Sequence, residues 1–233
     1  MSELPDFDLV TPDGSVVTDG VIFLHWFDPQ ADDGNKTQFR TEAEALVADG
    51  VLSALPQLQF PWSVDPLGSA ADLEQTEAEV SRLSACVDDL ARRGIERIVL
   101  VGHDFGAMHG ALLMARDPRI VAGVLIAPAN RWADWFLRFW PIEEDRFDYG
   151  RAMRPLDPIE HVSSIAPRPL LMQYADDDYF IAGMDASELY NAAGEPKRIE
   201  RFETDHAMRS DQALADRRAF ILGQLGARPA GTH

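Results

Sequence analysis

An aspartate, Asp104, lies at a point in the sequence that is suited to chemistry. It is the middle residue of Gly102-His103-Asp104-Phe105-Gly106, directly after an apolar run and directly before a helical segment. A strand that turns sharply into a helix pushes the middle residue of the turn out at the strand's carboxyl end, where open α/β sheets place their ligands. The turn is strained and closely packed, which explains a glycine on either side. Asp104 is therefore a candidate nucleophile, whereas we expect its neighbour His103 to pack and to form hydrogen bonds.

A carboxylate at this position selects the kind of carbon that is attacked. A serine loses a proton as it attacks and needs a histidine as base, but an aspartate, with an ordinary pKa of about 3.9, is already ionised at neutral pH. Attack on an ester carbonyl would give a reactive anhydride. Attack on a saturated carbon that bears a halide or an epoxide oxygen gives a stable alkyl ester. Asp104 thus favours a covalent ester intermediate.

An acid and a histidine follow Asp104 in the chain. The run Asp176-Asp177-Asp178 comes after one predicted strand, and His206 comes after the last. The elbow and the order nucleophile, acid, histidine resemble those of the α/β-hydrolase superfamily, whose usual elbow is Gly-x-Ser-x-Gly. The resemblance covers roughly residues 20 to 225. It implies a hydrolase with the catalytic residues Asp104, Asp177 and His206, and Asp176 and Asp178 compete for the role of the acid.

The resemblance to individual families points in two directions. The segment from Asp157 to Leu171 is similar to the approach to the acid strand in dienelactone hydrolases. The Gly-His-Asp-x-Gly elbow resembles those of haloalkane and haloacid dehalogenases and of epoxide hydrolases, which carry a large cap domain. We expect a hydrolase of the second kind that acts through a covalent ester. The alternatives are a dienelactone-type ester or lactone hydrolase with an altered nucleophile, and a non-hydrolytic catalyst or ligand-binding module on the same fold.

The resemblance also implies groups around Asp104. The loop that begins His25-Trp26, where the family usually has His-Gly, resembles one that supplies an oxyanion-hole amide, so Trp26 and Phe105 are the expected donors. Indole N–H groups are available for a leaving halide, and Arg131 or Arg138 can bind a substrate carboxylate. Epoxide hydrolases use a pair of cap tyrosines, whereas the insertion of this chain offers only Tyr149. The expected substrate-binding residues are His25, Trp62, Arg131, Trp132 and Trp135.

Short apolar runs that alternate with helical segments must position these groups. The alternation predicts an α/β fold with a mostly parallel central sheet and helices on both faces. The turn signal Pro12-Asp13-Gly14 within residues 7–18 predicts an antiparallel edge hairpin. Strands are expected at 21–25, 51–55, 98–101, 121–126, 169–173 and 197–202, and helices at about 37–49, 72–93, 106–116, 185–193 and 211–225.

The longest gap between predicted strands is unusually aromatic. We expect a short insertion at 128–168 within a single domain of residues 1–233, in place of a full cap domain. In one interpretation a helix packs Trp132, Trp135 and Phe136 on the sheet. In the other, the insertion is a small lid over the active site, and both can hold for different residues.

Composition excludes several classes of partner. A formal charge of −18, from 39 acidic and 21 basic residues, argues against nucleic acid and anionic membranes. The N-terminus has no signal-peptide pattern, and no apolar run spans a bilayer, so we expect a cytoplasmic protein. The single cysteine, Cys86, cannot form an intrachain disulfide, and no metal spacing is present. We expect a cofactor-independent, metal-free monomer or homodimer that acts on a small molecule.

Overall fold

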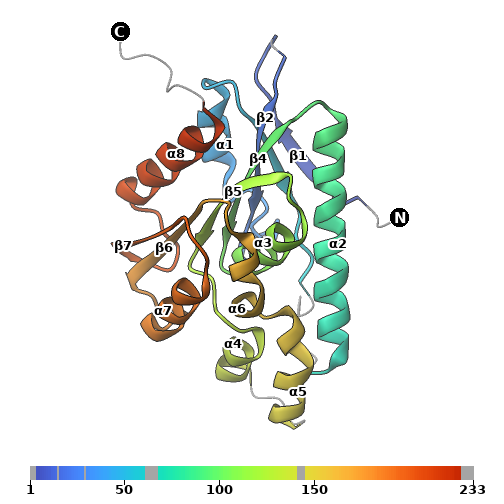
Figure 1. The fold of residues 1–233 in the computed structure, drawn as a ribbon, viewed down its shortest axis with the longest axis vertical. Helices are drawn as coiled ribbons and strands as arrows, with labels where there is room; N and C mark the ends of the chain where they lie inside the picture. Colours follow the sequence, from blue (N-terminus) through green and yellow to red (C-terminus); the bar gives the residue numbers. More distant parts are fainter. Residues whose placement is uncertain (1–3, 15, 29, 61–67, 141–144, 227–233) are drawn as a thin grey trace.

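The short apolar runs form the strands of one seven-stranded sheet (Figure 1). The computed structural model describes residues 4–14, 16–28, 30–60, 68–140 and 145–226. The strands are β1 (Phe7–Val10), β2 (Asp19–Leu24), β3 (Leu52–Pro56), β4 (Arg97–His103), β5 (Ile120–Ile126), β6 (Leu170–Asp177) and β7 (Lys197–Asp205). The predicted α/β-hydrolase fold is confirmed, with each of the six predicted strands present and shifted by a few residues at its ends.

The strand order is β1-β3-β2-β4-β5-β6-β7. Strand β1 pairs antiparallel with β3, and the other neighbours run parallel. The predicted edge hairpin is wrong, although β1 is an antiparallel edge strand. The partner of Phe7 is Pro56, because β3 lies between β1 and the strand that follows it in the chain. A local turn signal does not reveal an intervening strand of distant sequence.

The strand order reverses direction beside β2. The chain leaves β2 toward β3 on one side and returns to β4 on the other. The carboxyl ends of β2 and β4 therefore border the crevice in which parallel sheets bind ligands. Right-handed crossovers place the helices of the two directions on opposite faces of the sheet.

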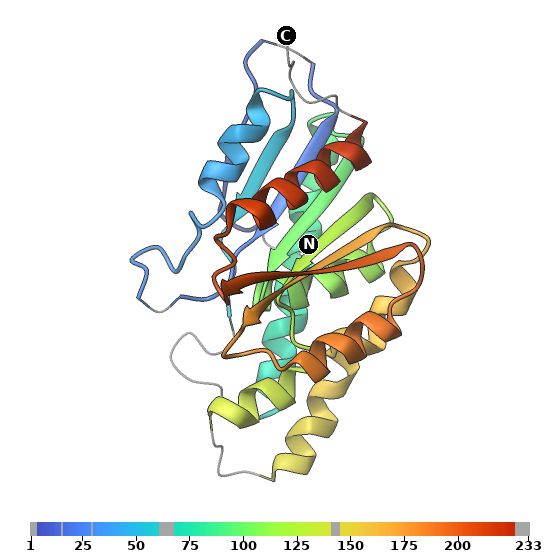
Figure 2. The same cartoon turned by 90° about the vertical axis from the view of Figure 1, so that its left-hand side faces the viewer.

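The helices cover both faces of the sheet. In Figures 1 and 2, α1 and α8 lie on one face, and α2 and α3 cover the other. Serine side chains cap two of these helices, Ser69 at α2 and Ser210 at α8, and Gly226 ends α8 in the left-handed conformation. The bounds are α1 (Arg40–Val47), α2 (Ala70–Arg92), α3 (Phe105–Arg116), α7 (Gly183–Ala192) and α8 (Asp211–Leu225).

Strands β4 and β5 and helix α3 form a largely buried part of the core. The first ten residues of α3, from Phe105 to Met114, are all buried. Strands covered on both faces read as nearly continuous apolar runs, as in Ile98–Val101. Asp104 thus lies between a buried strand and a helix whose first ten residues are buried.

The aromatic insertion folds into short helices at one end of the molecule (Figure 1). They are α4 (Trp132–Phe139), α5 (Arg146–Met153), the 3₁₀ turn η1 (Arg154–Leu156), α6 (Pro158–His161) and the 3₁₀ turn η2 (Val162–Ile165). Trp132 and Phe136 are completely buried, as the packing interpretation predicts. Trp135 is 6 % exposed and takes a different role, described below.

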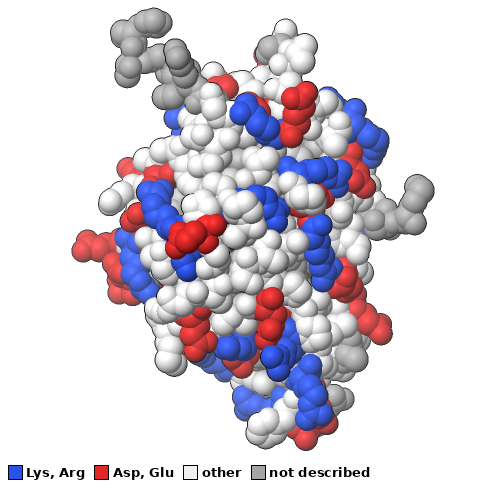
Figure 3. All heavy atoms as spheres, viewed as in Figure 1, with Lys and Arg blue, Asp and Glu red and all other residues white. Residues whose placement is uncertain are grey.

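Acidic and basic side chains intermingle on the surface. Figure 3 shows blue and red side chains interspersed on the visible face. Arg116 and Glu77 form one of the surface ion pairs. Within the described ranges, no helix has both the length and the apolar character needed to span a bilayer.

Candidate active site

Asp104 occupies the sharp turn between β4 and α3. Its backbone is strained, with φ 50° and ψ −114°, a conformation that residues other than glycine rarely adopt. Its amide donates to the Ile126 carbonyl at 2.8 Å, and its own carbonyl accepts from the Met108 amide in the first turn of α3. Strain of this kind persists only where the surrounding structure enforces it.

The two glycines of the elbow are required by close backbone contacts. A Cβ on Gly102 would lie 2.6 Å from the Gly106 carbonyl oxygen. A Cβ on Gly106 would overlap the carbonyls of Leu24 and His25 at the end of β2. The predicted reason for glycine at both positions is confirmed, and the elbow is locked against β2.

His206 lies between two carboxylates. Its Nε2 is 3.8 Å from Asp104 Oδ2, which is longer than a hydrogen bond. Its Nδ1 is 2.9 and 3.0 Å from the two oxygens of Asp178. The structure thus places the predicted nucleophile, Asp104, and a second aspartate on either side of His206.

The aspartate that contacts His206 is Asp178, and not Asp177, which we expected in this position. Strand β6 continues through Asp177, which pairs in register with Asp205 and is exposed. Asp178 is the first residue beyond the strand, and its side chain is 3 % exposed. The Oδ1 atom of Asp178 also accepts the amides of Phe180 and Ile181, which fix the carboxylate.

Burial and the two carboxylates set the charge of His206. Burial by itself lowers the pKa of His206, but Asp104 and Asp178 outweigh it and raise the pKa from 6.5 to about 9. Burial raises the pKa of Asp104 above its ordinary 3.8, and the positive charge on His206 opposes that rise. The two groups are coupled, because the charge on each favours the charged form of the other.

The predicted oxyanion-hole amides do not both face Asp104. The Trp26 amide donates to Gln38 Oε1 at 3.0 Å, so Trp26 is wrong as the donor. The Phe105 amide interacts with the Asp104 carboxylate. The next residue, Phe27, lines a pocket over Asp104, and its amide has no hydrogen-bond partner among the described residues.

A pocket of about 280 Å³ opens over Asp104 and His206. Its walls are almost entirely aromatic. Three of its polar atoms are buried without a hydrogen-bond partner among the described residues: Asp104 Oδ1, His206 Nε2 and Trp135 Nε1. The lining residues are Trp26, Phe27, Asp28, Asp104, Phe105, Trp135, Trp140, Phe180 and His206.

Of the predicted substrate-binding residues, Trp135 lies in the pocket. Trp132 does not, because its indole donates to the Leu156 carbonyl at 2.7 Å and its amide donates to Asp157 at 2.9 Å. Trp62 lies outside the described residues.

His25 and Arg131 are also wrong as pocket residues. His25 is 1 % exposed, and its ring joins the Trp26 carbonyl to the Leu58 amide, so it braces the loop after β2. Arg131 pairs with Glu188 at 3.0 Å over the outer surface of the insertion.

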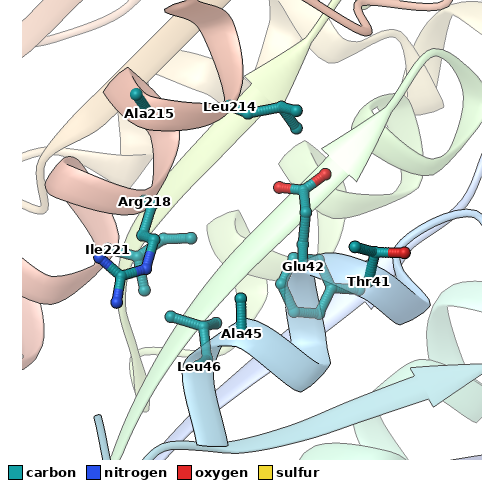
Figure 4. Close-up of a pocket in the computed structure, with 9 residues that line it drawn as sticks. Thr41, Glu42, Ala45, Leu46, Leu214, Ala215, Arg218 and Ile221 are labelled. Atoms are coloured by element: carbon teal, nitrogen blue, oxygen red, sulfur yellow. The ribbon is translucent and has the colours of Figure 1, made fainter. Parts of the chain in front are cut away.

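A separate hollow of about 210 Å³ lies between α1 and α8 (Figure 4). Leu46 and Ile221 face each other across it, and Glu42 extends from α1 toward α8. None of the residues that line the aromatic pocket lines this hollow. It is a gap in helix packing on the far side of the sheet from α3.

Comparison with known proteins identifies the family. Residues 21–227 match the sequence pattern described as the alpha/beta hydrolase family. The chain belongs to the alpha/beta hydrolase family. This membership confirms the predicted class of enzyme, a hydrolase. No curated protein matches the chain.

Solved structures share the fold of this alpha/beta hydrolase at low sequence identity. The esterase domain of a Rhodothermus marinus protein is 21 % identical, with a TM-score of 0.60 over 93 % of this chain and 88 % of that one. Est1E from Butyrivibrio proteoclasticus with bound ferulic acid is 15 % identical, with a TM-score of 0.73 over 95 % of each chain. A Klebsiella pneumoniae protein provisionally named a dienelactone hydrolase is 16 % identical, with a TM-score of 0.68 over 94 % of this chain and 92 % of that one.

Sequence reasoning missed several residues of this hydrolase site. Phe27, Trp140 and Phe180 line the pocket, and each lies within a few residues of a predicted site residue. The available signal was proximity in the sequence: Phe27 follows Trp26, Trp140 belongs to the aromatic run, and Phe180 lies two residues after Asp178. Gln38 contacts the site from a loop with no motif, so the sequence offered no signal for it.

Proposed function

We propose that this hydrolase attacks the saturated carbon of a small, uncharged alkyl halide with Asp104 and then hydrolyses the resulting ester. The observation that carries the proposal is the Asp104 carboxylate itself, held at the elbow with Oδ1 unpartnered and His206 3.8 Å away. In the first step Oδ1 forms a bond to carbon, and the carbon–halogen bond breaks with its electron pair on the halide. The product of this step is an alkyl ester of Asp104.

The charges around His206 support a histidine that becomes a base only after the first step. In the resting state, Asp104 and Asp178 raise the pKa of His206 to about 9. Esterification makes Asp104 neutral, which removes one of the two carboxylates that hold the proton on His206. The pKa then falls, and His206 releases its Nε2 proton to solvent, which balances the halide ion set free in the first step. The neutral Nε2 can then take a proton from water as that water attacks the ester carbonyl. The same proton is returned to the departing alcohol, and Asp104 is regenerated.

Backbone amides are available for the oxyanion of this second step. The Phe105 amide is already directed at the Asp104 carboxylate. The Phe27 amide is the second donor that we propose, since Trp26 is committed to Gln38. Two such donors stabilise the negative charge that develops on the ester carbonyl oxygen.

The pocket favours a halide over an epoxide as the leaving group. Trp135 Nε1 is buried and unpartnered, and an indole N–H is a suitable donor to a halide ion. Epoxide opening requires an acid for the ring oxygen, and Tyr149 is directed elsewhere, with its hydroxyl 3.1 Å from Asp72. Among the described residues, the pocket therefore supplies a halide donor and no phenolic acid.

The same walls favour a neutral substrate over a haloacid. No lysine or arginine is among the described residues that line the pocket. Arg131 is paired with Glu188, and Arg138 donates to the Phe180 carbonyl and lies near Asp185. A substrate carboxylate would enter an apolar pocket beside Asp104 without a cation, which is costly. A volume of about 280 Å³ suits a short alkyl chain.

Single turnover in heavy-oxygen water tests the mechanism. The enzyme is mixed with a smaller molar amount of each member of a panel of short 1-chloro- and 1-bromoalkanes, and the peptide containing Asp104 is weighed. We expect one heavy oxygen in that peptide, because water attacks the carboxyl carbon of the ester. Label found only in the alcohol, with none in the peptide, would rule out the ester. In His206→Gln, the unhydrolysed alkyl ester should accumulate on Asp104.

Ester hydrolysis is the second candidate, and the fold comparisons favour it. Esterases are among the structures that share this fold over more than nine-tenths of the chain. In that case Asp104 would attack an acyl carbon and give an anhydride, which hydroxylamine intercepts as an acyl hydroxamate. Turnover of short nitrophenyl esters with hydroxamate formation, and none of haloalkanes, would select this candidate.

A further inference from the structure

A chain of hydrogen bonds outside the pocket connects three loops of the site. Gln38 Nε2 lies 2.6 Å from His103 Nδ1, and His103 Nε2 lies 2.8 Å from the main-chain oxygen of His206. At its other end, Gln38 Oε1 accepts the amide of Trp26 at 3.0 Å. Gln38 thus joins the loop after β2 to the loop that carries His206, with the residue next to Asp104 between them.

Only one arrangement of protons satisfies all three contacts. The His206 carbonyl can only accept, so His103 Nε2 carries a hydrogen. In a neutral imidazole, Nδ1 is then an acceptor and must face the amide nitrogen of Gln38. The amide oxygen of Gln38 is left to face Trp26, which donates its N–H. The orientation of the Gln38 side chain follows from donors and acceptors alone.

His103 must stay neutral for His206 to function as proposed. His103 is 0 % exposed, and burial together with the positive charges of His206, Arg217 and Arg209 holds its pKa well below 6.5. The centroids of the His103 and His206 rings are 5.1 Å apart, and the Trp26 indole contacts both rings. A second positive charge at that distance would repel the proton from the imidazolium of His206.

We propose that Gln38 and His103 are positioning residues for His206, which fix its main chain and keep the neighbouring ring neutral. The effect on turnover rests on the proposed role of His206 as the base, whereas the proton arrangement does not. Gln38 does not line the pocket, so it acts through His103 and Trp26 and not through substrate contact.

Nitrogen NMR of the histidine rings tests the proton arrangement without a substrate. In the unaltered enzyme, His103 should be neutral at neutral pH, with its hydrogen on Nε2. In Gln38→Glu the new carboxylate only accepts, so His103 should gain a hydrogen on Nδ1 and become an imidazolium at neutral pH. A hydrogen on Nδ1 in the unaltered enzyme, or no change in Gln38→Glu, would overturn the proposal.

Gln38→Met tests the positioning effect, because methionine keeps the length of glutamine and forms neither strong hydrogen bond. We expect kcat to fall roughly 10- to 100-fold with KM changed less than about twofold, since a small displacement of His206 affects only the chemical step. The pKa of His206 should fall below that of the unaltered enzyme as the ring moves from Asp104 and Asp178. Unchanged kcat in an active enzyme, or an unchanged pKa of His206, would overturn the proposal.

Asn35→Gly is the matched control. Asn35 is in the same loop, and its side chain reaches Trp26 and Gln38 only at 3.4 Å. Its φ of 77° suits glycine. The control should retain the kcat and the histidine pKa values of the unaltered enzyme, and a loss equal to that of Gln38→Met would show that the loop as a whole, and not Gln38, is responsible. If no substrate is turned over, the proposed function fails, and the two NMR measurements still decide this inference.

Discussion

The two sides of His206 differ in whether their buried polar atoms have hydrogen-bond partners. On the pocket side, buried polar atoms of Asp104, His206 and Trp135 have no hydrogen-bond partner among the described residues. On the other side, both ring nitrogens of His103 and both ends of the Gln38 amide are bonded. A buried polar atom left unpaired costs about 1 to 3 kcal/mol. Around His206, the unpaired atoms lie on the side where a substrate can complete the bonds, and the paired atoms lie on the side that positions the ring.

Variants of the unbonded pocket groups should differ in their effects from variants of the bonded groups. Changes on the pocket side should affect turnover with little loss of folding stability, because they remove groups that are not yet bonded. Changes to bonded groups should disturb stability or geometry. The predictions that follow test this distinction, beginning with the largest expected effect.

Asp104→Ala should abolish turnover, with a fall in kcat on the order of 10⁴-fold or more, because no covalent intermediate can form. Thermal unfolding should change little, since the variant removes both the desolvation cost of a buried carboxylate and one of the two carboxylates that stabilise the charged form of His206. Steady-state kinetics and a melting curve measure both. Retention of more than about a hundredth of the activity would remove Asp104 as the nucleophile.

Asp178→Asn should lower kcat by roughly 10²- to 10⁴-fold, because the amide no longer holds the proton and orientation of His206. Asp177→Asn is the matched control and should remain within about twofold of the unaltered enzyme, since its side chain is exposed. Equal losses in the two variants would contradict the assignment of Asp178.

Trp135→Phe should lower kcat/KM for alkyl halides by roughly 10²-fold, because the leaving halide loses its donor. Trp132→Phe provides the contrast, since its indole is already bonded to the Leu156 carbonyl. That variant should lose about 1 to 3 kcal/mol of unfolding free energy and little activity. The opposite pattern in kinetics and denaturant unfolding would exchange the roles of the two tryptophans.

The smallest predicted effect is on stability against pH. The pKa of His206 is about 9 in the folded protein and 6.5 as its ordinary value, so this group stabilises the fold fully below about pH 6.5. The contribution is lost as pH rises toward 9. Asp104→Asn removes one cause of the raised pKa, so its midpoint of thermal unfolding should fall less between pH 6.5 and pH 9. Parallel curves for the two proteins would show that Asp104 does not hold the proton on His206.

Local patterns predicted the fold well, because each strand and helix has its own signature. The apolar run before Asp104 and the helical segment after it are both found where expected. The error at residues 7–18 arose because pairing depends on the strand order. Nothing in the residues near Phe7 indicates that β3 separates β1 from β2.

The site was predictable to within one or two residues, and side-chain direction accounts for the rest. By sequence alone, each of the three successive aspartates 176–178 is a candidate for the acid. Strand β6 ends at Asp177, and the side chain of the next residue, Asp178, contacts His206. His25 and Trp132 have suitable chemistry, but they are bonded within the core. Sequence type indicates what a group can do, and its contacts decide whether it is free to do so.

The sequence alone determined the α/β-hydrolase fold, the elbow with Asp104, and the pairing of His206 with an acid from residues 176–178. Local periodicity indicates the alternation of strands and helices, and the elbow glycines and the chain order carry the resemblance that implies the rest. The tertiary structure decided which acid binds His206, which amide is free beside Trp26, and that Gln38 is connected to the site. Those outcomes depend on distances between segments far apart in the chain, where a shift of one residue redirects a side chain to another partner.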